Sequence, residues 1–171
     1  MVNLRLWHAS RDPYHCAFRL LRLMTAKNAV MEVERFRVLD MFLLYPSLLH
    51  KSSMPREVRA EFMKLKISTL DRTFLQLPSA ASIFQDLRLY QNSAIAQLAA
   101  RGIVDADALK RRSLAVIEQN VPSEMMGRAR TRNTEGEGLA SFLVGPFSNI
   151  PLRGTESIYR KAGLPSRGIP A

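Results

Sequence analysis

The chain has 171 residues, of which 47% are hydrophobic and 23% are charged, a balance typical of a folded globular protein rather than a disordered one. Its 25 lysines and arginines outnumber its 15 aspartates and glutamates, and the formal net charge of +10 favours contact with nucleic acid or with an acidic protein surface. A protein that is merely soluble and basic is the alternative. The single cysteine, Cys16, excludes an internal disulfide and leaves no basis for a metal site built from thiolates.

The sequence gives no sign of a membrane or secretory segment. Charged residues interrupt the first apolar run, unlike the uncharged core of a signal peptide. The uncharged stretch 138–152 contains Pro and Gly and is shorter than the roughly 18 to 20 residues of a membrane span. We therefore expect a cytoplasmic protein without membrane contact.

Two N-terminal segments, 14–24 and 32–45, carry apolar residues at helical spacing around most of the helix circumference. Such helices need cover on two sides, either from the core alone or from the core and a partner protein. The residues that we assign to a partner interface are Tyr14, Phe18, Arg19, Arg22, Arg37, Met41 and Leu44.

The second segment also carries Glu34, Arg37 and Asp40, three residues apart. This spacing lets Arg37 reach a carboxylate on either side, and it predicts a solvated, salt-bridged edge worth a few tenths of a kcal/mol per pair.

Two further helical regions follow. Ser53 can cap a helix through Leu65, and Pro78 with Ser79 can start a long region with a bend at 91–93. Gly102 stands where a left-handed helix cap belongs, with Ile103 packing back on the last turn.

After Gly102 the pattern changes to a short apolar run, 114–117, which we predict to be a strand. A helix end, a basic linker and a strand together outline the last helix and wing of a winged helix-turn-helix, although many helix–strand junctions also place Gly at the helix end. The predicted fold class is therefore mainly α with a small β element, a helical domain containing a winged helix-turn-helix-like unit.

The segment 126–138 alternates arginines with small residues and is predicted to be a loop, followed by a helix from Thr134 to Val144. The chain beyond Pro146 is rich in Pro and Gly, so its end is expected to lie along the surface or a partner. We divide the chain into a helical, winged-helix-like domain, 1–125, and a C-terminal part, 126–171. Two basic clusters are candidates for contact with nucleic acid or an acidic partner, with plain solvation as the alternative: Lys110, Arg111, Arg112, Arg128, Arg130 and Arg132.

Catalytic motifs are missing from the sequence. A Gly-Lys dipeptide, required by the phosphate-binding loop of nucleotide hydrolases, does not occur, and the three histidines stand in no zinc-binding spacing. His15 and Cys16 are neighbours, but adjacent residues of a helix point about 100° apart, so a half-exposed histidine and a buried thiol are favoured over a catalytic pair. We predict no catalytic residues, no cofactor, no metal and no enzymatic activity.

Four segments carry a resemblance to a known family. Residues 12–23 (DPYHCAFRLLRL), 33–46 (VERFRVLDMFLLYP), 91–105 (ending LAARGIVD) and 143–147 (LVGPF) with Leu152 resemble the small middle components of bacterial ABC three-component conflict systems. That group includes the middle subunit of Lamassu antiphage defence. The resemblance covers about residues 8–165, and its motifs are diffuse and hydrophobic.

This resemblance implies a non-catalytic subunit that bridges an SMC-like ABC ATPase, which senses invading DNA, and an effector such as a nuclease. It supplies no catalytic residues, and contact with DNA is possible either directly or through the complex. The competing interpretation is a stand-alone winged-helix DNA-binding transcriptional regulator, favoured by the net charge and by the outline from Arg101 to Ile117.

Overall fold

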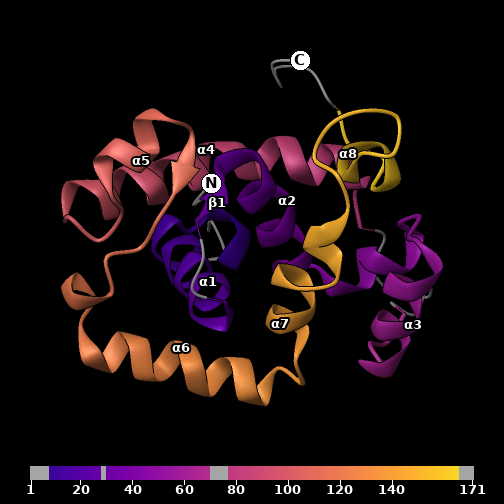
Figure 1. Cartoon of the computed structure of the whole chain (residues 1–171), viewed down its shortest axis with the longest axis horizontal. Helices are drawn as coiled ribbons and strands as arrows, with labels where there is room; N and C mark the ends of the chain where they lie inside the picture. The colour runs from indigo at the N-terminus through magenta and orange to yellow at the C-terminus, as the bar shows by residue number, and fades with distance from the viewer. Residues whose placement is uncertain (1–7, 28–29, 70–76, 166–171) are drawn as a thin grey trace, which may run out of the picture.

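The computed structural model describes residues 8–27, 30–69 and 77–165. Its regular structure is mainly helical with one small sheet, as the sequence predicts (Figure 1). The helices are α1 (Pro13–Ala26), α2 (Val33–Leu44), α3 (Arg56–Lys64), α4 (Ala80–Ala100), α5 (Ala106–Lys110), α6 (Ser123–Glu135), α7 (Leu139–Val144) and α8 (Ile158–Lys161). Short 3-10 turns are η1 (Ala9–Arg11), η2 (Pro46–Lys51), η3 (Glu118–Asn120) and η4 (Phe147–Asn149), and the strands are β1 (Met31–Glu32) and β2 (Ser113–Leu114).

Helix α1 lies at the centre of the fold, in contact with α2, α4, α6 and α7 (Figure 1). It starts where the Asp12 carboxylate accepts hydrogen bonds from the backbone N–H groups of Tyr14 (2.8 Å) and His15 (3.3 Å), with Pro13 in the first position. Because four helices pack around α1, apolar side chains on most of its circumference are buried against them. The wide apolar faces of α1 and α2 are therefore covered largely by this chain itself, and they give no separate argument for a partner.

Helix α4 is one continuous helix, so the predicted bend at 91–93 is wrong. The polar residue Gln91 does not break the helix because its side chain is fully buried and donates a hydrogen bond to Asp40 (2.8 Å). The predicted end of the helix is confirmed. Gly102 has φ +67°, and the Ile103 N–H donates to the Leu98 carbonyl (2.9 Å), as in a Schellman cap.

Helix α3 begins later than predicted. Its first residue is Arg56, after Pro55, and Ser53 is not its cap. The backbone N–H of Ser53 instead donates to the carbonyl of Lys161 (2.8 Å), which ties this loop to α8.

The sheet joins two segments far apart in sequence. β1 and β2 pair antiparallel, with Met31 opposite Leu114, and an isolated bridge joins Val104 to Val116. The predicted strand at 114–117 is therefore present only as this short pairing. After β2 the chain enters η3 and α6, and the described residues contain no further strand that could complete a wing hairpin. The winged-helix detail is not confirmed.

Helix α6 occupies most of the segment predicted as a loop, so that prediction is wrong. Its arginines lie on the outer face, whereas Met126 and Ala129, three residues apart, are buried against the core. The helix predicted from Thr134 starts only at Leu139, because Gly138 adopts a left-handed backbone (φ +83°) that separates α6 from α7, which does end at Val144.

The chain beyond Pro146 packs into the core up to the last described residues, and residues 166–171, at the end that was predicted to lie along the surface or a partner, fall outside the described residues. One hydrophobic cluster runs from Cys16 to Leu164 and includes Tyr159, which is 3% exposed. Its members come from both sides of the predicted boundary at residue 125, which falls inside α6. None of the helices in the described ranges combines the length and the apolar character needed to cross a bilayer.

Candidate functional site

The residues assigned to a partner interface separate into two groups. Arg19 and Met41 are 1% and 0% exposed, so the structure contradicts their assignment to a partner surface in this fold. They lie on the inner sides of α1 and α2, where wide apolar faces meet the core. Arg22, Arg37 and Leu44 are partly buried.

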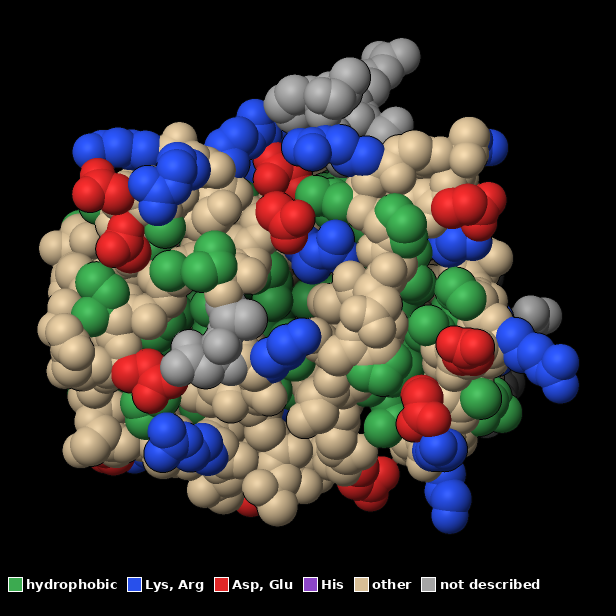
Figure 2. Space-filling view, viewed as in Figure 1, with side chains coloured by type: hydrophobic (Ala, Val, Ile, Leu, Met, Phe, Trp, Pro, Cys, Tyr) green, Lys and Arg blue, Asp and Glu red, His purple; other side chains and the backbone are tan. Residues whose placement is uncertain are grey.

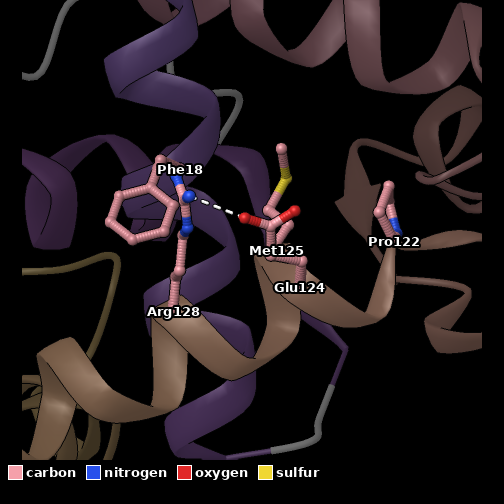
Figure 3. A pocket seen from close by; sticks show the side chains of 5 residues that line it. All are labelled: Phe18, Pro122, Glu124, Met125 and Arg128. Atoms are coloured by element: carbon pink, nitrogen blue, oxygen red, sulfur yellow. Dashed lines mark hydrogen bonds and ion pairs between the residues drawn. The ribbon is translucent and has the colours of Figure 1, made fainter.

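Tyr14 and Phe18, one helical turn apart on α1, do reach the surface. Tyr14 is 64% exposed and Phe18 is partly buried. Phe18 forms one wall of an open pocket of about 320 Å³ between α1 and the start of α6 (Figure 3). The other lining residues come from α6 and its cap: Pro122, Glu124, Met125 and Arg128.

The position of this groove follows from how α6 is attached to α1. Near the ends of both helices, the Arg22 Nε donates to the Asn133 side-chain oxygen (3.1 Å), and the Asn133 amide donates to the Arg22 carbonyl (2.8 Å). At the end of the first turn of α6, Met126 packs into the core, followed by Ala129 one turn later. The residues before Met126, Glu124 and Met125, are exposed, and the groove opens there beside Phe18.

The groove combines an apolar floor with a charged rim. Met125 remains 37% exposed, and the ring of Phe18 lies next to the Arg128 side chain (Figure 3). Arg128 pairs with Glu124 across the rim (2.6 Å), and both side chains are about three-quarters exposed, at 73% and 75%. An aromatic ring and a methionine can pack against an apolar side chain of varied shape, which suits protein recognition.

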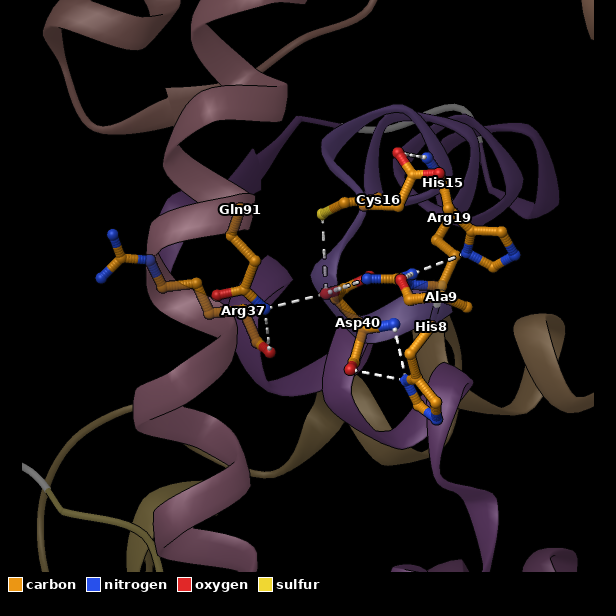
Figure 4. Close-up of polar contacts among 10 residues, drawn as sticks. His8, Ala9, His15, Cys16, Arg19, Arg37, Asp40 and Gln91 are labelled. Carbon is orange, nitrogen blue, oxygen red and sulfur yellow. Dashed lines mark hydrogen bonds and ion pairs between the residues drawn. The ribbon is translucent and has the colours of Figure 1, made fainter. Parts of the chain in front are cut away.

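A second cluster, around Asp40, is buried and polar (Figure 4). Arg19 donates to both carboxylate oxygens of Asp40, from Nε (2.6 Å) and Nη2 (3.1 Å), and Gln91 donates to the second oxygen (2.8 Å). Arg19 also donates to the Ala9 carbonyl (3.1 Å) and hydrogen-bonds with the His15 ring (2.7 Å). Burial would lower the pKa of Arg19, but the Asp40 carboxylate outweighs it and raises that pKa.

This cluster corrects the prediction of a solvated edge on α2. Asp40 is 0% exposed and Glu34 is 6% exposed, and Arg37 donates to Asn92 instead of to either carboxylate. The Cys16 thiol contacts Asp40 at 3.8 Å, and burial raises its pKa, which disfavours a nucleophilic thiolate. The cluster is closed to solvent and pins α1 to α2 and α4, so its role is structural.

The basic candidates are mostly neutralised by acidic residues of the same chain. Four ion pairs account for this: Lys110 with Asp107, Arg112 with Glu34, Arg128 with Glu124, and Arg132 with Glu135. Arg111 and Arg130 are exposed and have no ion pair within the described ranges. Figure 2 shows basic and acidic side chains interspersed on one face rather than a single basic field. Contact with nucleic acid stays a prediction.

Fold and surface together define a mainly helical protein with an apolar groove between α1 and α6, and the described residues contain no cluster of His, Cys, Asp or Glu that could hold a metal ion. The family model described as ABC-three component (ABC-3C) system Middle Component 5 matches residues 5–167, and the chain belongs to this family. The predicted resemblance to the middle components of these systems is thereby confirmed. No curated protein and no solved structure matches the chain.

Proposed function

We propose that this chain is a non-catalytic bridging subunit of a Lamassu-type antiphage and anti-plasmid defence complex. It links an SMC-like ABC ATPase, which senses DNA, to an effector such as a nuclease. The observation that carries this proposal is the family match over residues 5–167, because a middle component of a three-component system works with two other components.

The groove between α1 and α6 is the contact that we propose for one of these components. An apolar side chain of the partner fills the space beside Phe18, and Tyr14 and Met125 extend the apolar contact area. The Glu124–Arg128 pair forms a polar rim that can exchange its internal ion pair for one with the partner. Aromatic side chains at the centre of an interface typically contribute most of its binding energy.

Co-expression with the ATPase and the effector encoded beside it tests the bridging role. We expect the tagged chain to retain both components through affinity purification and size-exclusion chromatography. A chain that elutes as a free, folded monomer in the presence of both components would overturn the proposal.

Variants of exposed apolar residues then test the groove. Tyr14→Ser combined with Met125→Ser is expected to weaken retention of one component at least ten-fold, a loss of about 1.4 kcal/mol or more of binding free energy. Leu89→Ser is the matched control, because Leu89 is 70% exposed on α4 and does not line the groove. Equal loss of binding in both variants would show that the effect is not specific to the groove.

A stand-alone DNA-binding regulator is the second candidate, supported by the formal charge of +10 and by the exposed Arg111 and Arg130. A DNA-binding assay with increasing salt distinguishes it, because several phosphate contacts make affinity fall steeply with salt concentration. Absent or salt-independent binding by the isolated chain excludes this alternative.

A further inference from the structure

Three arginines from three separate elements converge beside α2. Arg37 lies on α2 and donates from Nη2 to Asn92 of α4. Arg88 lies on α4 one turn before Asn92, so it projects from the same helix face. Arg112, which precedes β2, pairs with Glu34, one turn before Arg37 on α2.

The Glu34 carboxylate beside these arginines already has an ion-pair partner. Glu34 is 6% exposed and is held by Arg112, while the Tyr159 hydroxyl donates to the Glu34 carbonyl (3.2 Å). Arg88 has no hydrogen bond or ion pair within the described part of the chain, and the Nε of Arg37 is buried without a hydrogen-bond partner there. The groups that act electrostatically on the Arg37 side chain include one carboxylate, Glu34, and two further arginines, Arg88 and Arg112, so positive charge is in excess here.

The electrostatic environment of Arg37 agrees with this excess. Burial lowers the pKa of Arg37; Tyr159 and Glu34 act to raise it, and Arg88 and Arg112 act to lower it. An anion placed among the three arginines would relieve this repulsion. It would also supply an acceptor for the exposed guanidinium of Arg88, which has no partner in the described chain.

We propose that Arg37, Arg88 and Arg112 form a binding site for a small oxyanion, the phosphate group of a free ligand. Arginine suits this role because its planar fork of N–H donors matches the oxygens of a phosphate. Arg88 and Arg112 both act electrostatically on Arg37, and a compact group of this kind fits a single anionic group better than an extended nucleic-acid backbone. The site lies within this one chain and does not depend on the proposed bridging function.

Thermal unfolding of the full chain with inorganic phosphate tests the site. Phosphate is added against sodium chloride at matched ionic strength, so that general screening is the same in both series. We expect a saturable rise in Tm with phosphate, because a ligand that binds only the folded state stabilises it. Isothermal titration calorimetry gives the affinity.

Two matched variants identify the location. Arg88→Gln is expected to lower phosphate affinity at least ten-fold, and Arg88 is exposed, so the variant should fold normally. Arg130→Gln removes an exposed arginine of α6, also without an ion pair in the described chain, and should leave phosphate affinity unchanged. The proposal is overturned if phosphate has no saturable effect on the wild type or if it stabilises Arg88→Gln equally.

A final arm distinguishes a free phosphate ligand from nucleic acid. A duplex oligonucleotide without terminal phosphates is titrated into wild type and Arg88→Gln. Loss of duplex binding in the variant, with no saturable effect of inorganic phosphate on the wild type, would assign the cluster to nucleic acid and overturn the small-ligand site.

Discussion

Arginine has opposite roles in two regions of this molecule. Arg19 is 1% exposed in the core and donates to Asp40, His15 and the chain backbone, whereas Arg128 on α6 is 73% exposed and has one surface partner. Both arginines lie within α-helices, Arg19 in α1 and Arg128 in α6. The contribution of a charged residue to stability therefore depends on whether the residue and its partner are both removed from water.

The physical reason is the cost of desolvation. A buried charge is tolerated only when it is paired and its remaining hydrogen-bonding capacity is satisfied. In water the same pair gains little, because the high dielectric constant and salt weaken the attraction. Four substitutions, Asp40→Ala, Gln91→Leu, His15→Gln and Arg128→Ala, test this contrast between the core and the surface, two of them with a further control variant.

Asp40→Ala is expected to have the largest effect, a loss of about 3–5 kcal/mol in the free energy of unfolding, because it leaves the Arg19 guanidinium buried without its counter-charge. Denaturation in urea measures the loss. The loss should change little with salt, because the pair is closed to solvent.

The double variant Arg19→Met with Asp40→Leu is the control for this effect. Replacing both charges by apolar side chains removes the uncompensated charge, and we expect it to recover most of the stability. If the double variant were as unstable as Asp40→Ala, the loss would come from disturbed packing and not from the unpaired arginine.

Gln91→Leu is expected to cost less, about 1–3 kcal/mol, because it removes the neutral donor to Asp40 and to the Arg37 carbonyl but keeps the ion pair. The matched variant is Gln85→Leu on the exposed side of the same helix, which should change stability by no more than about 0.5 kcal/mol. Equal effects of the two substitutions in urea denaturation would contradict the structural role of Gln91.

The sequence predicted the parts of the fold that depend on apolar periodicity or on a special backbone conformation. Helices α1 and α2 and the left-handed cap at Gly102 belong to this class. The burial of Asp40 could not be predicted from the sequence. Charged residues three positions apart occur on solvated helix edges, and the same spacing occurs here although Asp40 is buried and paired with Arg19 of another helix. Helix α6 was missed because its two buried residues give a weak apolar stripe beside many arginines.

The candidate sites were predictable only in part. Tyr14 and Phe18 were assigned to a partner interface, but Pro122 and Met125 lie just before the segment 126–138 that was predicted as a loop, so their side of the groove was missed. Arg37 and Arg112 were assigned to different contacts, but Arg112 pairs with Glu34, which lies one turn before Arg37 on α2 and which the sequence placed on a solvated edge. Such long-range pairings leave no local signal in one sequence.

His15, which hydrogen-bonds with Arg19 in the buried cluster, makes the stability of the fold sensitive to pH. Burial lowers its pKa below the ordinary 6.5, Arg19 and Arg22 lower it further, and Asp12 and Asp40 oppose them. Between the lowered pKa and 6.5, the folded state binds fewer protons than the unfolded state, so stability falls as the pH falls through this window.

The comparison of wild type with His15→Gln isolates this contribution, since all other titrating groups are shared. Wild type is expected to lose more unfolding free energy than His15→Gln between about pH 7.5 and about pH 5, measured by urea denaturation at each pH. Identical pH profiles would show that protonation of His15 is not coupled to folding.

Arg128→Ala completes the series with the smallest effect, about 0.3–0.5 kcal/mol, as expected for an exposed pair four residues apart on a helix. Its loss should disappear at high salt, in contrast to the salt-independent loss of Asp40→Ala. If Arg128→Ala were costly and salt-independent, the α6 arginines would resemble Arg19, and burial would not be what separates the two regions. Because the substitution leaves the fold nearly unchanged, any larger effect on retention of a partner component would report directly on the rim of the groove.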